Sequence, residues 1–174
     1  MGPNQVFELA IVLLSVVAVW RLWGSHRPLL RRYCLIFIGV FLFEFSTQLL
    51  WQNKGLDWFT YLGPTLNWII TLGWTNIIFF SMLIIDRFND SAGLPKFIGC
   101  LVLTVLVSLF AEQLVLSMGI RGYGPEITSF LTGNTVPLLT VPVEALYYMP
   151  VFIALILGFV GYWEMALSKP GRRR

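Results

Sequence analysis

The sequence predicts an all-α membrane protein, folded as a single polytopic bundle of about five transmembrane helices. Of 174 residues, 57% are hydrophobic and only 12% are charged, and the mean hydropathy is +0.76, a composition that suits a chain dissolved in lipid. A hydrocarbon layer about 30 Å thick needs roughly 20 apolar residues for each helical crossing, and five stretches have that length. Their apolar runs are continuous and do not alternate, which argues against a membrane β-barrel.

The five predicted helices fill most of the chain. They cover residues 5–24, 33–52, 61–85, 97–118 and 136–165. The first has neither a basic start nor a small-residue cleavage site, so we expect it to be retained and not removed as a signal peptide. The longest predicted connection covers residues 119–135, which leaves no room for a soluble module. We therefore expect one transmembrane domain over residues 1–174.

The basic residues predict how the bundle is oriented. Ten of the twelve lysines and arginines fall on one predicted side of the membrane, and only Lys54 and Arg121 fall on the other. Because positive residues concentrate in cytoplasmic loops, the N-terminus is expected outside and the C-terminus in the cytoplasm. The expected location is the cytoplasmic (inner) membrane of a prokaryote. The net charge of +3 is then a topology signal, and no nucleic acid partner is expected.

Three carboxylates inside the predicted helices carry most of the functional information. Glu44, Glu112 and Glu144 belong to three different predicted helices, at depths of roughly 9 to 12 Å below the outer surface. An ionised acid at the centre of a membrane helix costs about 2.5 to 3.5 kcal/mol, so three at one depth indicate function. We expect them to meet in one cavity. Because burial and like charges disfavour the ionised form, at least one of them is expected to be a neutral acid.

Aromatic and amide side chains form stripes at helical spacing, both on the helices that carry these carboxylates and on the predicted helix 61–85. We expect the stripes to line the same cavity and to bind a substrate through Gln48, Trp51, Asn67, Trp74, Tyr147 and Tyr148. For small polar groups such as Asn67 the alternative is an interhelical hydrogen bond worth about 0.6 to 2 kcal/mol. The sequence has no histidine pair, HExxH or CxxC, so no metal site and no cofactor are expected.

The last third of the chain resembles a known family. The order AEQLVLSMGIRGYGPE, a glycine-containing loop, LLTVPVEALYYMP and GYWEMA is similar to that of the membrane-embedded lycopene cyclases and related carotenoid-modifying proteins. At Ala145 the family usually carries a second acid. The matching positions are Glu112, Gly122 to Pro125, Pro142, Glu144, Tyr147 and Tyr148.

The resemblance implies a redox-neutral reaction on a long isoprenoid or related lipid. In such a reaction an acidic side chain protonates a double bond, and cyclisation, isomerisation or hydration follows. A neutral carboxylic acid can donate the proton, and tyrosine and tryptophan faces can stabilise a cation. The expected enzyme is a terpene cyclase or isomerase of carotenoid biosynthesis, with Glu144 as the favoured acid and Glu112 and Glu44 as its partners. Pro142 and Pro150 would bend the last helix and widen the cavity there.

Two other functions remain open. The same carboxylates can hold a cationic or amphipathic small ligand, or carry protons, in a binding or transport protein. They can also face a partner helix in a non-catalytic subunit of a membrane complex. The expected partners are membrane lipids and a hydrophobic lipid or isoprenoid substrate, with a homo-oligomer or a complex with other membrane enzymes as further options.

Overall fold

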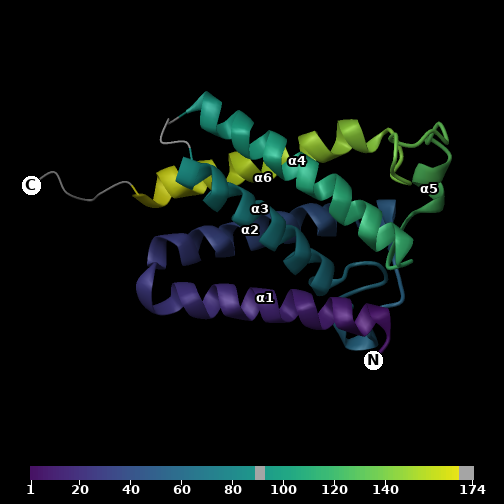
Figure 1. Cartoon of the computed structure of the whole chain (residues 1–174), viewed down its shortest axis with the longest axis horizontal. Coiled ribbons are helices and arrows are strands. Elements are labelled where there is room, and N and C mark those ends of the chain that lie inside the picture. Colours follow the sequence, from purple (N-terminus) through teal and green to yellow (C-terminus); the bar gives the residue numbers. More distant parts are fainter. Residues whose placement is uncertain (89–92, 169–174) are drawn as a thin grey trace, which may run out of the picture.

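Five long helices form the body of the protein in a computed structural model that describes residues 1–88 and 93–168. α3 packs against α2 and α4, and α6 packs against the same two helices, so that these four form a ring. α1 lies outside the ring against α2 and α3 (Figure 1). The helices are α1 (Pro3–Ser25), α2 (Arg27–Ser46), α3 (Trp68–Phe88), α4 (Leu94–Ser117) and α6 (Ala145–Ser168).

Four of the five helices, α1, α3, α4 and α6, are long and apolar enough to cross a membrane. The protein is therefore a membrane protein built as an all-α bundle, as predicted. α2 is also 20 residues long, but it carries Arg27, Arg31, Arg32 and Glu44 and is the most charged of the five. Large apolar side chains such as that of Phe110 are exposed on the outside of the bundle, where lipid tails offer them an equally apolar environment.

Local sequence explains where several helices begin. α1 and α4 have proline in their first turn, where its missing N–H costs no hydrogen bond. α4 follows Gly93, whose φ of +85° suits glycine. The side chain of Asn67 caps α3, because its Oδ1 accepts hydrogen bonds from the amides of Ile69 at 2.9 Å and Ile70 at 3.4 Å.

The predicted start of the last helix was wrong. α6 begins at Ala145 and not at residue 136, so Glu144 lies in the preceding loop. Residues 134–143 fold back on themselves, with the amide of Val136 bonded to the carbonyl of Val141 at 2.8 Å and the amide of Val143 to that of Asn134 at 3.0 Å. Pro142 has no N–H to donate to a helix. Pro150 lies inside α6, where it cannot donate the helical hydrogen bond to Leu146.

The second and third helices are shorter at one end than predicted. α2 ends at Ser46 and is followed by a 3-10 helix, Gln48–Leu50. α3 begins at Trp68 and not at residue 61, because Asn67 caps it there. Gln48 and Trp51 were predicted on a membrane helix and instead belong to the segment that connects α2 to α3.

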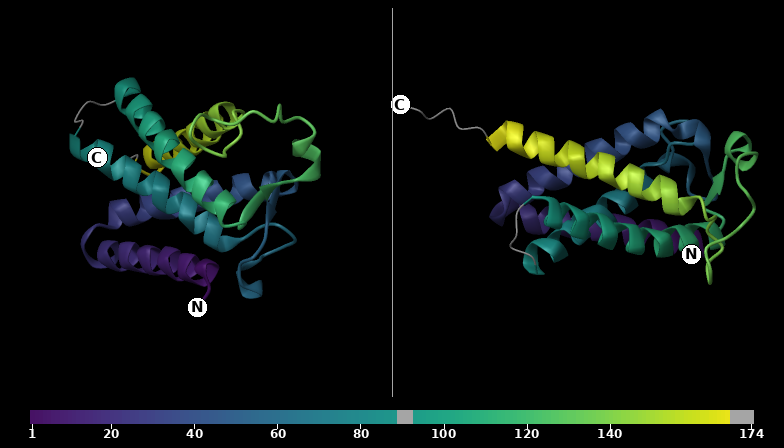
Figure 2. Two further views of the ribbon diagram at one scale, coloured as in Figure 1. Left: turned by 45° about the vertical axis from the view of Figure 1, so that its right-hand side comes forward. Right: turned by 90° about the horizontal axis from the view of Figure 1, so that it is seen from above.

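A two-stranded antiparallel ribbon closes one end of the bundle. β1 (Trp51–Asn53) pairs with β2 (Arg121–Tyr123) in the register Trp51–Tyr123, Gln52–Gly122 and Asn53–Arg121. Because side chains alternate across a strand, Trp51, Arg121 and Tyr123 share one face, and it is turned towards the helices. Both Trp51 and Arg121 are buried, whereas Gln52 is exposed. Figure 2 shows the ribbon and the short helix α5 (Pro125–Thr128) at this end, in the segments that connect α2 to α3 and α4 to α6.

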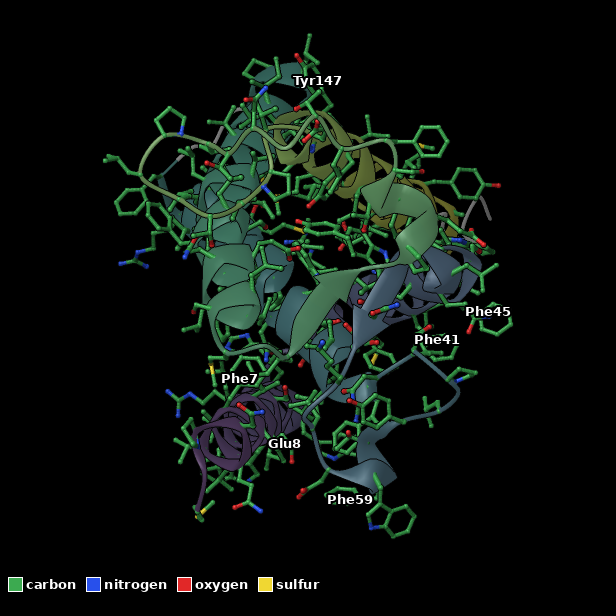
Figure 3. The ribbon with its side chains drawn as sticks, turned by 90° about the vertical axis from the view of Figure 1, so that its right-hand side faces the viewer. Phe7, Glu8, Phe41, Phe45, Phe59 and Tyr147 are labelled. Carbon is green, nitrogen blue, oxygen red and sulfur yellow. The ribbon has the colours of Figure 1, made fainter. Side chains whose placement is uncertain are left out.

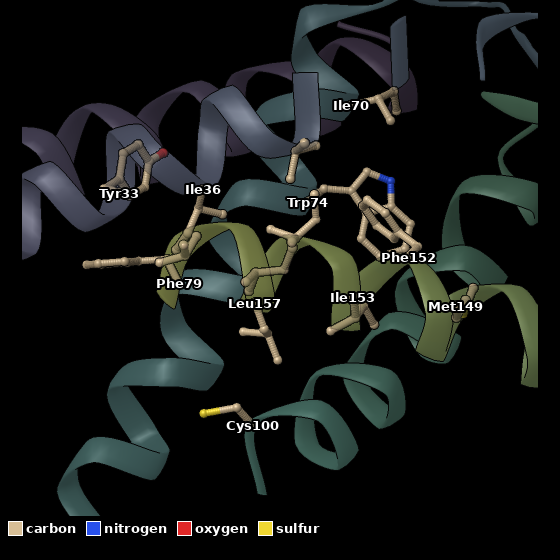
Figure 4. Close-up of a cluster of buried hydrophobic side chains, with 14 of the residues drawn as sticks. Tyr33, Ile36, Ile70, Trp74, Phe79, Cys100, Met149, Phe152, Ile153 and Leu157 are labelled. Atoms are coloured by element: carbon tan, nitrogen blue, oxygen red, sulfur yellow. The ribbon is translucent and has the colours of Figure 1, made fainter. Parts of the chain in front are cut away.

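The core lies inside the ring and is continuous with the ribbon. Trp74 of α3 and Phe152 of α6 pack edge to face with ring centroids 5.0 Å apart, and Phe43 of α2 packs on Phe152 at 4.4 Å. Figure 4 shows Met149, Phe152, Ile153 and Leu157 following one another along α6, with Trp74 of α3 beside Phe152. This packing fixes the helices that present the polar groups described below.

The opposite end of the ring is held by ion pairs. Arg32 of α2 contacts Asp86 of α3 at 2.5 Å and Glu164 of α6 at 2.7 Å, and Lys96 of α4 contacts Asp86 at 2.6 Å. All four helices of the ring are thus joined by charged side chains. We call this the inner end and the ribbon end the outer end.

Candidate functional site

A buried cluster of opposite charges lies where the ribbon meets the bundle. The guanidinium of Arg121 reaches inwards from β2, with Nη1 3.5 Å from Oε1 of Glu44 on α2 and Nε 3.9 Å from Oε1 of Glu112 on α4. The exposed fractions are 5% for Arg121, 5% for Glu44 and 2% for Glu112. If all three groups are ionised their formal charges sum to −1. Because a buried net charge is costly, the cluster can accept one proton or one cationic group.

Hydroxyl groups complete the cluster. Thr71 of α3 donates a hydrogen bond of 2.5 Å to Oε2 of Glu44. Tyr123 of β2 donates to Oε1 of Glu112 at 3.3 Å, and its oxygen lies 3.1 Å from the hydroxyl of Tyr148 on α6. Burial, and then the charge of Glu112, raise the pKa of Tyr123 above its usual range, so this hydroxyl keeps its proton at neutral pH.

Aromatic rings enclose the guanidinium. The central carbon of Arg121 lies 4.0 Å from the ring centroid of Trp51 and 6.0 Å from that of Trp74. Trp51 in turn packs on Tyr123 at 5.6 Å and on Tyr148 at 5.5 Å. A desolvated cation over an indole face is stabilised by about 2 kcal/mol, so the two tryptophans help to keep Arg121 inside.

An apolar cavity of about 320 Å³ extends from this cluster between α1, α3 and α4. On α3 its lining runs from Ile70 to Ile84, a separation that spans about 21 Å of helix. Leu14 of α1 and Val107 of α4 line the cavity and are exposed, so it opens to the outside of the bundle. Glu112 and Arg121 line it at the outer end and are its only charged residues in the described part of the chain.

The structure brings together five of the predicted site residues. Glu44, Trp51, Trp74 and Tyr148 line a small cavity beside Arg121, and Glu112 is joined to them through Arg121. Two of the three carboxylates that were expected to meet in one cavity, Glu44 and Glu112, thus come together on Arg121, although each lines a different cavity.

Glu144 is not part of the cluster, so the prediction was wrong for this carboxylate. It lies in the loop before α6, and its Oε1 accepts a hydrogen bond of 2.8 Å from the amide of Thr132. This amide is the main cause of a lowered pKa for Glu144. Tyr147 lies on the exposed face of α6, and 73% of the residue is exposed. Figure 3 shows it at the edge of the molecule, away from the ribbon.

The two predicted amides have structural positions. Asn67 is buried, and besides capping α3 it donates a hydrogen bond of 2.7 Å to Thr60. Gln48 lies in the 3-10 helix, where its backbone carbonyl accepts a hydrogen bond of 2.7 Å from Thr65. Among the described residues that line the two cavities, neither amide is present. For Asn67 the structural alternative is the better interpretation.

Sequence reasoning missed Arg121, the residue that organises the site. The residue was counted as a loop charge on the outer side, because it follows a predicted helix and precedes a glycine-rich stretch. One signal was available: ionisable groups within a membrane pair with one another, and two buried acids on different helices need a cation. Arg121 and Lys54 are the only cations predicted on that side.

Comparison with protein-family models, with curated proteins and with solved structures finds no significant match to this chain.

Proposed function

We propose that the protein binds a long isoprenoid or related lipid in the cavity between α1, α3 and α4, with the functional end of the lipid beside Glu112 and Arg121. The observation that carries the proposal is the distribution of charge along the cavity. Along about 21 Å of α3 its lining is apolar except for Asn76 and Ser81, and both charged residues lie at the outer end. A long apolar chain with one polar or reactive end matches this shape. The opening between α1 and α4 lets the chain enter from the lipid phase.

The charges of the cluster favour a neutral lipid. Arg121 offers N–H donors and Glu112 offers a carboxyl oxygen, so a hydroxyl group can accept from one and donate to the other. An anionic head group would add to the formal charge of −1 of Glu44, Glu112 and Arg121, and burying further uncompensated charge is costly. An isoprenoid alcohol or a polyene therefore suits the site better than a diphosphate or a fatty acid.

The proposal places the bundle across a membrane with five helical crossings. α2 packs between α3 and α6 in the ring, and its 20 residues span about 30 Å. Basic residues of α2, α3 and α4 gather at the inner end, which by the positive-inside rule faces the cytoplasm. In our proposal the membrane is the inner membrane of a prokaryote. An impermeant thiol reagent should then label a Phe130→Cys variant from outside intact cells.

Filling the cavity tests lipid binding. A Cβ at Gly73 of α3 would lie 3.8 Å from Ile11 of α1, so Gly73→Leu places a larger side chain between these helices. Gly158→Leu is the matched control, because a Cβ there meets nothing within 4 Å and the residue is exposed on α6. We expect mass spectrometry of the purified proteins to detect a specific lipid with the wild type and the control, and at least tenfold less with Gly73→Leu. Equal amounts in all three would contradict the proposal.

A second candidate function, acid-initiated chemistry on the bound lipid, is favoured by the position of Glu112. It is the only carboxyl group that lines the large cavity in the part of the chain that the structure describes. When Glu112 is protonated it can transfer its proton to a double bond, which leaves a carbocation and a carboxylate. The cation closes a ring or shifts, and a neighbouring carbon returns a proton to Glu112. No electrons are gained or lost.

Lipid profiles of cells that express variants test this chemistry. Glu112→Gln should abolish the altered lipid, whereas Glu126→Gln, at an exposed position of α5, should leave its amount unchanged. If Glu144→Gln abolishes the product and Glu112→Gln does not, the assignment of Glu112 fails and the family resemblance gives the better account. If the wild type binds lipid but alters none, binding stands without chemistry.

A further inference from the structure

A second and much smaller cavity, of about 20 Å³, lies beside the same cluster. Aromatic rings form most of its wall, and its polar lining comes from Glu44, Arg121, Tyr148 and the indole of Trp51. A cavity needs about 10 to 15 Å³ and two to four polar partners to hold one water molecule. The volume therefore fits a single water molecule and excludes the end group of a lipid.

Two buried N–H groups at this cavity lack an acceptor within the described residues. They are Nε1 of Trp51 and Nη1 of Arg121, and the side chain of Arg121 is only 4% exposed. Nε of Arg121, 3.9 Å from Oε1 of Glu112, has no hydrogen-bond acceptor among the described residues either. Oε1 of Glu44 lies 3.5 Å from Nη1, which is long for a hydrogen bond between charged groups. Buried donors in folded proteins nearly always have partners, so both groups indicate an acceptor bound between them.

We propose that the small cavity binds one water molecule, and that this water completes a proton path between Glu44 and Glu112. When Glu44 is ionised, the water would accept from Trp51 and Arg121 and donate to Glu44 and Tyr148. When Glu44 is protonated, the water would accept from Glu44 and from one of the two N–H groups, and would still donate to Tyr148. From Tyr148 the path continues to the hydroxyl of Tyr123 at 3.1 Å and from there to Oε1 of Glu112 at 3.3 Å. An anion is the poorer occupant, because Glu44 lines the cavity and the cluster already has a formal charge of −1.

Proton transfer along this path requires no other chemical step. A proton that leaves Glu44 for the water displaces one from the water to Tyr148, then one to Tyr123 and one to Glu112. Each oxygen keeps its electron pairs, and nothing is oxidised or reduced. Glu44 and Glu112 can then alternate as the protonated acid while Arg121 pairs with the other. Tyr123 lies on the ribbon and is half-buried, so it is also the point at which the path meets the outer surface.

Infrared spectroscopy of the purified protein tests the path without any lipid ligand. The carboxylic acid C=O band of Glu44 is followed in a Glu112→Gln background, and that of Glu112 in a Glu44→Gln background. Each variant protein is transferred from H₂O to D₂O, and the rate at which its band shifts is measured. Tyr148→Phe should slow exchange at Glu44 at least tenfold and leave exchange at Glu112 unchanged, because Glu112 still contacts Tyr123. Tyr123→Phe should slow exchange at both carboxyl groups.

The controls separate a proton path from a general change in structure. Tyr147→Phe removes the hydroxyl of the adjacent exposed residue and should change neither rate. Trp51→Phe keeps a ring over Arg121 but removes the N–H. The wild type should show a bound-water O–H band that shifts in H₂¹⁸O, and this band should disappear in Trp51→Phe. The proposal is overturned if neither carboxyl shows an acid band, if Tyr148→Phe behaves like Tyr147→Phe, or if a soaked bromide ion occupies the cavity. These measurements use no lipid, so their results do not depend on whether Gly73→Leu loses lipid binding.

Discussion

Arg121 shows how one residue can convert two membrane carboxylates into a stable arrangement. A buried ion pair gains little over an apolar pair, but removing one partner leaves a bare charge in a medium that solvates it poorly. Here one guanidinium serves Glu44 and Glu112 together and rests on Trp51. Its loss therefore affects three elements, α2, α4 and the ribbon.

We expect Arg121→Met to lower the free energy of unfolding by about 3 to 5 kcal/mol, because two carboxylates remain buried without a cation. Lys54→Met, an exposed cation beside the same ribbon, should change it by less than about 0.5 kcal/mol. Thermal unfolding in detergent measures both. Adding Glu44→Gln and Glu112→Gln to Arg121→Met should restore part of the loss, and a triple variant no more stable than Arg121→Met would contradict this account of the charges.

Glu144 makes a second residue-scale prediction, which concerns pH. The amide of Thr132 lowers its pKa in the folded protein, whereas the unfolded value is about 4.3. Its contribution to stability is therefore fully present above about pH 4.3 and is lost as the pH falls through the lower folded pKa. Limited proteolysis between residues 129 and 143 should increase in that acidic window. In Glu144→Gln the cleavage rate should not depend on pH there, and an identical pH profile in wild type and variant would contradict the assignment.

At the scale of elements, the helices were predictable and the ribbon was not. A long apolar run has few alternatives to a membrane helix, which is why the predictions for α1 and α4 agree with the structure within a few residues. Each strand of the ribbon has three residues, too few to show an alternating pattern. The start of α6 was missed because residues 136–143 are as apolar as the helix that follows, although they fold back as a loop.

Gly124 provides the test for the ribbon. A Cβ at this position would lie 2.7 Å from the backbone carbonyl oxygen of Leu49, which cannot turn aside as a side chain can. Gly124→Ala should therefore cost about 1 to 3 kcal/mol of stability and disturb Arg121 on the strand that ends directly before Gly124. At Gly122 a Cβ would meet only the carbonyl oxygen of Gln52 at 3.8 Å, an ordinary contact, so Gly122→Ala should be tolerated. Equal unfolding temperatures for the two variants would show that the ribbon does not close as described.

At the scale of the whole molecule, the ring of four helices is joined by charged groups at both ends. Arg32, Asp86, Lys96 and Glu164 lie at the inner end, and Glu44, Arg121 and Glu112 lie at the outer end. α1 stands outside this ring and supplies one wall of the apolar cavity. The sequence alone indicated Glu44, Glu112 and a cavity between helices, but not that α1 lines the large cavity, because this depends on how α1 packs against α3 and α4.

The central claim is that a long lipid lies along this cavity with its functional end at Glu112. Photocrosslinking with an isoprenoid alcohol that carries a photoreactive group at the end remote from its hydroxyl tests it most directly. We expect mass spectrometry to locate the adducts at the inner part of the cavity, near Phe80 and Ile84, and an unlabelled alcohol to compete with them. Adducts confined to the exposed face of α6, around Leu155, and insensitive to competition would contradict the claim.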